Sequence, residues 1–359
     1  MFFTDNFKKF WKKNKNSKNF DKDLRFITEK FINSNSYNFV SNQWQKLNIN
    51  DYKTIQKYGL TKYGSKISTH YFTFGEYLDE HLENLVSQKF NQKKIKLNSN
   101  IFKKQKEFNY KYSLNYNILC LLLFERLKKS KVFSKLKLLK DNTFLDSEYP
   151  FIKINKYNIT TDKIVSLFDY EYINEFKSLK RKSKILEIGA GAGRVAECLL
   201  TVNKKLKYTI CDIPPSIYIS YKRLKKSFPQ KKIELLIDEK DKERLIKRLI
   251  KNDISFILPH QLDLIKQFYF DISLAIDCLH EMDKKTINSY FSSISKNSKY
   301  FYFSIWQKTK NWDSKGLLKK TERLDFNKGD YLIPKSWKKI FKKKLVFPSN
   351  QIALGYKIR

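Results

Sequence analysis

The chain has 359 residues and carries 73 Lys and Arg against 36 Asp and Glu, a formal net charge of +37. Its 41% hydrophobic and 16% aromatic residues exclude the composition of a disordered protein, and its length allows two compact units. The longest apolar run, 118–124, is too short to span a bilayer, and the four cysteines lack the spacing of a zinc site or redox pair. We therefore expect a soluble, cytoplasmic protein with buried free thiols.

The N-terminal half is predicted to be mostly helical. Apolar residues recur at three- and four-residue spacing in three segments, 21–32, 75–86 and 114–127. A fourth helix is expected at about 160–179, because Thr160, Thr161 and Asp162 can cap its first turn.

A basic turn, Lys180-Arg181-Lys182-Ser183, follows the fourth helix and marks the expected domain boundary. Residues 1–180 would form a helical region that covers the substrate or mediates oligomerisation. Residues 181–359 would form the cofactor-binding domain.

After this turn, short apolar segments alternate with amphipathic ones, which predicts a parallel α/β sheet with helices on both faces. The expected strands are 184–188, 206–211, 254–258, 270–277 and 300–306, with two closing strands that end at residue 358. The expected helices lie near 194–202, 216–227 and 284–296, with an extra charged helix near 238–248.

The segment Glu187-Ile-Gly-Ala-Gly-Ala-Gly193 joins a predicted strand to a predicted helix. Glycines in such a turn let the chain bend sharply and let backbone amides approach a ligand. The spacing differs from the pyrophosphate fingerprint Gly-x-Gly-x-x-Gly, because Gly193 comes one residue early. It resembles motif I of the Rossmann-like S-adenosylmethionine methyltransferases. The resemblance implies a class I methyltransferase sheet that binds S-adenosyl-L-methionine through Glu187, Gly189, Gly191 and Gly193.

Two later strand ends carry further candidates for cofactor binding. Asp212 ends the strand after the glycine turn, where a carboxylate can accept hydrogen bonds from both ribose hydroxyls. Alternatively, it only begins the turn Asp-Ile-Pro-Pro. His260 or Gln261 could hydrogen-bond the adenine, or both could be polar loop residues without a ligand.

The strand at 270–277 delivers Asp277, His280 and Glu281 to the carboxyl edge of the sheet, where ligands bind in open α/β folds. Asp277 is a candidate for cofactor binding. His280 suits the role of a base oriented by Glu281, or both could bind sugar hydroxyls. The alternative is that His280 only caps the helix that opens at Asp283. These acids could also hold a metal, but acids at a helix start commonly serve as caps, so no metal is predicted.

Four segments together resemble the sugar O-methyltransferase family of bacterial surface-glycan gene clusters: Leu186 to Arg194, Cys211-Asp-Ile-Pro-Pro, Leu279-His-Glu-Met282, and Tyr300 to Trp306. The match covers about residues 180–310, and residues 67–74 are similar to the amino-terminal part of that family. Ala192 departs from the larger, often aromatic residue of such proteins. The resemblance implies O-methylation of a sugar that is nucleotide-, lipid- or polysaccharide-linked.

The net positive charge leaves other partners open. Scattered lysines accompany Asn, Ile, Tyr and Phe, so a genome-wide base bias could supply the excess. If the charge is functional, it could hold the protein at the anionic inner membrane face, or attract RNA to an RNA methyltransferase. Nucleic acid is disfavoured because no RNA-binding module or Asn-Pro-Pro-Tyr motif is present. A non-catalytic scaffold with a methyltransferase fold is the remaining alternative.

Overall fold

The computed structural model describes residues 2–36, 40, 42–60, 114–140, 151–154, 156–265, 270–308, 324–348 and 351–358. The helix expected at 75–86 and the family-like segment 67–74 lie outside the described residues. No helix in these described ranges combines the length and hydrophobicity needed to cross a bilayer. The four cysteines are free and buried, as expected.

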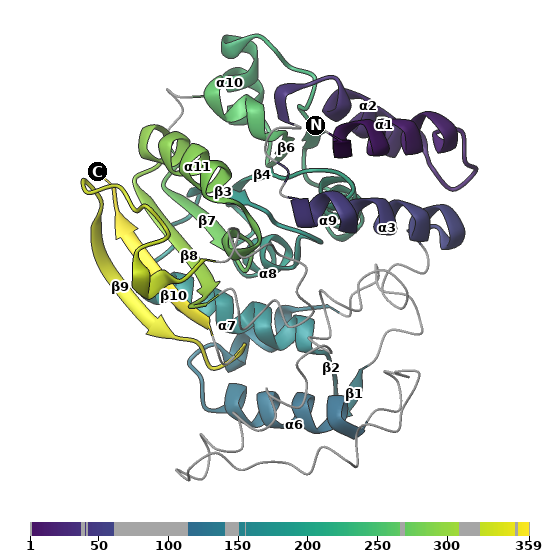
Figure 1. The fold of residues 1–359 in the computed structure, drawn as a ribbon. Helices are drawn as coiled ribbons and strands as arrows, with labels where there is room; N and C mark the ends of the chain where they lie inside the picture. The colour runs from purple at the N-terminus through teal and green to yellow at the C-terminus, as the bar shows by residue number, and fades with distance from the viewer. Residues whose placement is uncertain are drawn as a thin grey trace.

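An eight-stranded sheet forms the centre of the molecule (Figure 1). Its strands, in spatial order, are β5 (Ile233–Leu235), β6 (Ile254–Ile257), β4 (Lys207–Cys211), β3 (Lys184–Ile188), β7 (Ile272–Ile276), β8 (Tyr300–Trp306), β10 (Gln351–Lys357) and β9 (Lys338–Lys344). The strands from β5 to β8 are parallel, and β10 runs antiparallel to both of its neighbours. The mostly parallel sheet confirms the expected α/β class.

Helices cover both faces of the sheet, because side chains alternate between two apolar clusters along each strand. Ile185 of β3 belongs to the cluster that α7, α8 and α9 cover, whereas Leu186 belongs to the cluster under α10 and α11. The bounds are α7 (Thr161–Phe176), α8 (Arg194–Val202), α9 (Ser216–Ser227), α10 (Lys242–Lys251) and α11 (Lys284–Asn297).

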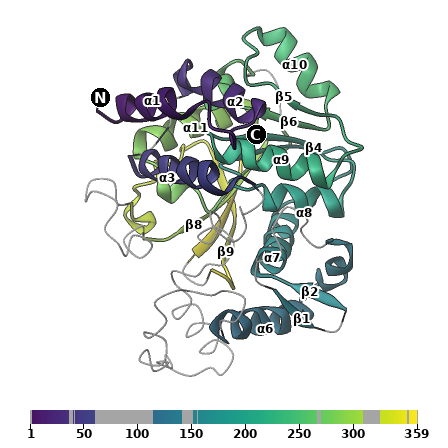
Figure 2. The same cartoon turned by 90° about the vertical axis from the view of Figure 1, so that its right-hand side faces the viewer.

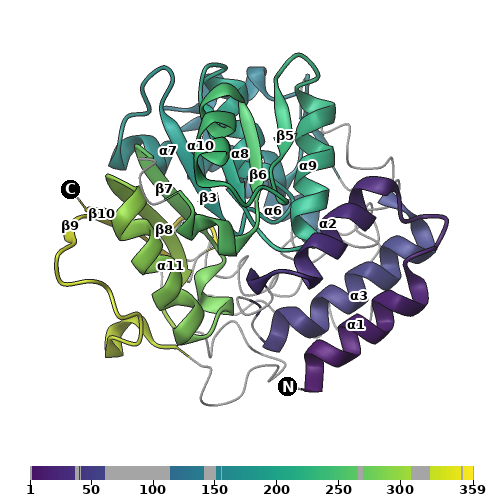
Figure 3. The same ribbon diagram turned by 90° about the horizontal axis from the view of Figure 1, so that it is seen from above.

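The N-terminal region packs onto the first of these clusters. Its helices are α1 (Phe2–Asn14), α2 (Lys22–Ile32), α3 (Asn42–Tyr58) and α6 (Leu114–Lys128), and a hairpin of β1 (Ile152–Ile154) and β2 (Tyr157–Ile159) lies beside α6 (Figure 2). Helices α1, α2 and α3 lie side by side next to α9 (Figure 3). Tyr52 packs against Phe7, Trp11 and Phe20 in their core. Lys222 of α9 forms ion pairs with two aspartates at the start of α2.

Several elements were not expected from sequence. These are α1, α3, the β1–β2 hairpin and the three-residue strand β5. The fourth predicted helix ends at Phe176 rather than at 179, because Lys177 adopts an extended backbone. This helix, α7, was assigned to the N-terminal region, yet it packs against the sheet through Phe176. The boundary at residue 180 stays a prediction.

The order of the strands defines where a ligand would bind. From β3 the chain passes to its neighbour β4, then to the edge strand β5, and then to β6, which lies between β5 and β4. It next crosses to β7 on the other side of β3 and continues to β8. In open α/β sheets, ligands bind at the carboxyl ends of the strands where this order reverses. The turns that follow β3 and β7 meet at this point.

Close packing of α7 on β10 gives a test of the fold. A Cβ atom on Gly355 would lie 2.4 Å from the ring of Phe176. We expect Gly355→Ala to lower the free energy of unfolding, measured by urea denaturation, by about 1–3 kcal/mol through overpacking. In a Phe176→Leu background the same change should cost less, because the smaller side chain leaves room. An equal cost in both backgrounds would contradict this packing.

Candidate functional site

The turn between β3 and α8 depends on three glycines with positive φ: Gly189 (+66°), Gly191 (+56°) and Gly193 (+75°). A Cβ on Gly189 would lie 2.8 Å from the Cβ of Cys278, and one on Gly193 would lie 3.0 Å from the Cβ of Ser220. Both glycines are therefore required for packing as well as for backbone conformation. Around Gly191, in contrast, no atom of the described residues lies within 4 Å of the Cβ position, apart from Gly191 itself and its two chain neighbours. Among the described residues, the middle of the turn therefore meets no side chain.

Asp212 holds this turn in place from the end of β4. Its Oδ2 accepts a hydrogen bond from the backbone N–H of Gly191 at 2.9 Å, and its Oδ1 accepts one from Ile213 at 2.7 Å. Each carboxylate oxygen has a second lone pair, so both can accept further bonds, such as those from a ribose. Burial raises the pKa of Asp212 to about 7.

Glu187 is the penultimate residue of β3, and it lies on the same face of the sheet as Ile185. Its Oε2 accepts a hydrogen bond from the hydroxyl of Tyr208 at 2.8 Å, and the residue is only 1% exposed. Burial raises its pKa to about 7, despite the Tyr208 bond and the positive charge of Arg194. In this structure Glu187 is a buried residue that helps to fix the strand leading into the glycine turn.

Asp277 directly follows β7, at the same edge of the sheet as the glycine turn. It adopts φ +56°, an unusual conformation for a residue with a side chain and one that clusters at functional sites. Its backbone N–H donates to Ser304, and its Oδ1 accepts from Nε2 of Gln351. Burial raises its pKa to about 7, although Arg194 acts against this shift.

Arg194 begins α8 and is the counter-charge to these acids. Its guanidinium donates to Asp169 of α7 at 2.5 Å and to Ser166 at 3.4 Å. Its charge acts to lower the pKa values of Asp169, Glu187 and Asp277. The sequence analysis assigned no role to Arg194 or Asp169. The position of Arg194 directly after the third glycine could have indicated that it lies near the ligand. Nothing in the sequence around Asp169 indicated a role for that residue.

His280 and Glu281 lie in a short 3₁₀ helix, Leu279–Glu281, after β7. The imidazole of His280 is fully buried, with Nε2 3.6 Å from Oδ1 of Asp277 and 4.0 Å from Oε1 of Glu281. Burial lowers the pKa of His280 to about 3, so the ring is neutral near pH 7.

Glu281 is held by the N-terminal region. The indole Nε1 of Trp44, on α3, donates a 2.7 Å hydrogen bond to its Oε2. Burial raises the pKa of Glu281 well above its ordinary value, and the Trp44 bond partly opposes this shift. Helix α3 therefore closes over the carboxyl edge of the sheet. No local sequence pattern indicates this contact, since 237 residues separate the partners.

His260 and Gln261 lie in the 3₁₀ helix Pro259–Asp263, which follows β6. His260 Nδ1 is 2.6 Å from the hydroxyl oxygen of Ser36, beyond the end of α2. The amide of Gln261 is used inside the fold: its oxygen accepts from Leu258, and its nitrogen donates to the carbonyls of Leu236 and Glu239.

The structure brings Asp212, Asp277, His280 and Glu281 to the same edge as the glycine turn. Asp283 caps α11 by accepting a 2.7 Å hydrogen bond from Thr286 N–H. Within the part of the chain that the structure describes, no group of three His, Cys, Asp or Glu side chains is placed to hold a metal ion.

Known proteins give limited guidance. No protein-family model matches the sequence, and no curated protein matches it. Among solved structures, the chain is similar to the mitomycin 7-O-methyltransferase MmcR (TM-score 0.39, 12% identity, 55% of this chain and 56% of that chain covered). It is similar to the glycopeptide N-methyltransferase MtfA complexed with sinefungin (TM-score 0.36, 11% identity, 51% and 83% covered). At these TM-scores the likeness decides neither cofactor nor substrate.

The buried carboxyl of Glu187 predicts how the stability of the protein changes with pH. Its raised pKa means that ionisation opposes folding, so its stabilising contribution is present below pH 4.5 and is lost as the pH rises through about 7. Glu187→Gln still accepts the Tyr208 bond but cannot ionise. Relative to wild type, its free energy of unfolding should increase from about pH 5 to about pH 8, on the order of 2 kcal/mol. A difference that stays constant with pH in denaturant titrations would argue against burial of this charge.

Proposed function

We propose that this chain is an S-adenosylmethionine-dependent methyltransferase that methylates a sugar hydroxyl. The observation that carries the proposal is the open face of Gly191, bounded by Asp212 and Asp277 at the point where the strand order reverses. A ligand can approach the backbone there without meeting a side chain of the described residues, and Asp212 and Asp277 are acidic. Such a site suits a ligand that carries positive charge together with hydroxyl groups.

S-adenosylmethionine has these features, since it bears a sulfonium, an α-ammonium and a ribose. Asp212 would accept hydrogen bonds from the ribose hydroxyls through its remaining lone pairs. The backbone of the turn at Gly191 would lie against the methionine part, with Asp277 on the opposite side. His260 would reach the adenine through Nε2. Gln261 is left out of this set, because backbone groups already use its amide.

When bound, the cofactor supplies a methyl group on a positively charged sulfur. The protein must then hold an acceptor oxygen in line with that methyl and remove its proton. Glu281, with its raised pKa, is better matched to proton removal near neutrality than an ordinary carboxylate. We assign it the role of base, and assign His280 the role of a buried neutral group that positions Glu281 and Asp277.

The more specific part of the proposal is that the methyl acceptor is a sugar. Glu281, Asp277 and the indole of Trp44 supply acceptors and an aromatic surface of the kind that binds hydroxyl-rich ligands. The resemblance of Leu279-His-Glu-Met282 and Cys211-Asp-Ile-Pro-Pro to sugar O-methyltransferases points the same way. Surface-glycan precursors in the cytoplasm are the substrates that this resemblance suggests.

Calorimetric titration with S-adenosylhomocysteine tests the cofactor. We expect Gly191→Arg to weaken binding by about 100-fold or more, or about 2.7 kcal/mol, because its side chain would fill the open face. Gly329→Arg is the matched control, since Gly329 also has positive φ (+76°) and free space at its Cβ position, but lies outside the turn. Binding that is absent from folded wild type, or lost equally in both variants, would contradict the proposal and favour a non-catalytic scaffold.

The hydrogen bond from Trp44 gives a test of the base. The bond lowers the pKa of Glu281, so Trp44→Phe should raise that pKa and move the acidic limb of the kcat–pH profile to higher pH. Transfer of radiolabelled methyl to a panel of sugar nucleotides and lipid-linked sugars would supply the acceptor for this assay. Glu281→Gln should lower kcat by about 100-fold or more while it leaves S-adenosylhomocysteine affinity nearly unchanged. An unmoved acidic limb in Trp44→Phe would exclude Glu281 as the base.

A further inference from the structure

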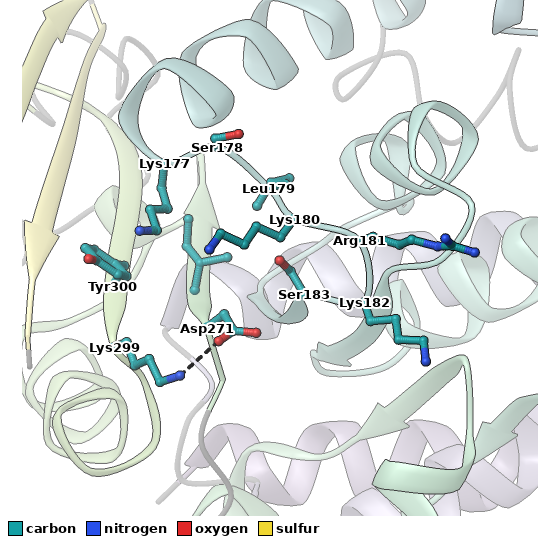
Figure 4. A pocket seen from close by; sticks show the side chains of 11 residues that line it. Lys177, Ser178, Leu179, Lys180, Arg181, Lys182, Ser183, Asp271, Lys299 and Tyr300 are labelled. Atoms are coloured by element: carbon teal, nitrogen blue, oxygen red, sulfur yellow. Dashed lines mark hydrogen bonds and ion pairs between the residues drawn. The ribbon is translucent and has the colours of Figure 1, made fainter.

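A hollow lies at the opposite edge of the sheet from the glycine turn. It has a volume of about 380 Å³ and opens where β3, β7 and β8 begin (Figure 4). Leu179, Ile272 and Tyr300 line its apolar part. Because β3 spans five residues, or about 17 Å, this hollow and the glycine turn lie at opposite ends of the same strand.

The charged residues that line this hollow are mostly basic. Five residues are cationic (Lys177, Lys180, Arg181, Lys182 and Lys299), and one is acidic (Asp271). The whole chain has 73 basic and 36 acidic residues, so the lining has a higher share of basic residues than the chain. Asp271 is already neutralised, since it pairs with Lys299 at 3.1 Å and accepts a hydrogen bond from the backbone N–H of Lys184 at 3.0 Å. The remaining charges are therefore uncompensated by the lining itself.

Two of these lysines face the hollow. Figure 4 shows the ammonium groups of Lys177 and Lys180 directed into it, whereas Arg181 and Lys182 point away. Lys177 lies over the ring of Tyr300 at 4.3 Å, and the edge of Phe176 contacts the same ring. The ring of Tyr300 is thus already covered by Lys177 and Phe176. This favours a ligand that is recognised by its charge over one that would stack a base on the ring.

The backbone that carries these lysines is fixed. Lys182 adopts φ +67°, a conformation that costs a non-glycine residue energy and that clusters at functional sites. The carbonyl of Lys180 accepts hydrogen bonds from the N–H of Ser183 at 3.1 Å and from the side chain of Asn203 at 3.3 Å. Ser183 in turn accepts a backbone bond from Lys207 at 3.0 Å. The turn holds Lys180 in place before any ligand arrives.

We propose that this basic hollow binds a phosphate-bearing anion and is separate from the methyl-transfer site. Lysine ammonium groups bind phosphate oxygens as point charges, and hydrogen bonds to a charged partner are stronger than neutral ones. The positive surface continues beside the hollow, because Lys357 of β10 pairs in register with both Tyr300 and Lys338. This extension suits a ligand with more than one phosphate charge.

Calorimetric titration of the full chain with inorganic pyrophosphate tests the site. We expect binding that weakens about tenfold or more in Lys180→Glu and also weakens in Lys177→Gln. Lys247→Glu, on the exposed face of α10, makes the same change in net charge as Lys180→Glu and should bind as wild type does. S-adenosylhomocysteine affinity should be unchanged in all three variants, so failure of this site is distinguishable from failure of the proposed function.

A second arm uses sedimentation with vesicles of phosphatidylcholine and phosphatidic acid in equal parts, to distinguish a lipid headgroup from a free phosphate. Loss of vesicle binding in Lys180→Glu, but not in Lys247→Glu, would identify the headgroup as a source. Pyrophosphate binding without this loss would identify a free ligand. Equal weakening in Lys180→Glu and Lys247→Glu, or no binding of either probe to wild type, would overturn the proposal.

Discussion

Desolvated negative charge at the carboxyl edge of the sheet is the constraint around which the rest of the site is arranged. Burial raises the pKa values of Glu187, Asp212 and Asp277 to about 7. Arg194 is the cation that acts on two of these groups, and it is already paired with Asp169. Buried carboxylates that have hydrogen bonds but no cation of their own are costly to ionise, and sites with several perturbed pKa values are commonly functional. A cationic ligand would relieve this cost, which links the electrostatics of the fold to the proposed cofactor.

The glycine turn makes that edge accessible. Gly189 and Gly193 are fixed by packing against Cys278 and Ser220, so they set the path of the backbone. Gly191 then presents its face to open space, with its amide held by Asp212. The N-terminal helices close over the same edge, since Trp44 reaches Glu281 and Ser36 reaches His260. The helical region therefore belongs to the site physically, although it precedes it by more than a hundred residues.

The elements that could be predicted from the sequence are those that a local residue pattern specifies. The β3–turn–α8 unit and α9 match the expected ranges, because alternating apolar residues, glycines and amphipathic spacing act within a few residues of one another. Strand β5 was not predicted, because it has only three residues, all half-buried, with no clear apolar pattern. It forms by pairing with β6. The Trp44–Glu281 and Ser36–His260 contacts join residues more than two hundred positions apart, and no local signal encodes them. Gln261 was a reasonable candidate in sequence, yet its partners, Leu236 and Glu239, became visible only in three dimensions.

The most direct test compares two ligands that differ in charge at the reacting atom. Sinefungin carries an amine where S-adenosylhomocysteine has a neutral sulfur, so the carboxyl groups around Gly191 should favour it. Competition between the two ligands, measured by calorimetry above pH 7 where these carboxyls ionise, should show tighter binding of sinefungin, with the preference reduced in Asp277→Asn. Equal affinity for both ligands, or no binding of either to the folded protein, would contradict the account of an acidic site built for a cationic cofactor.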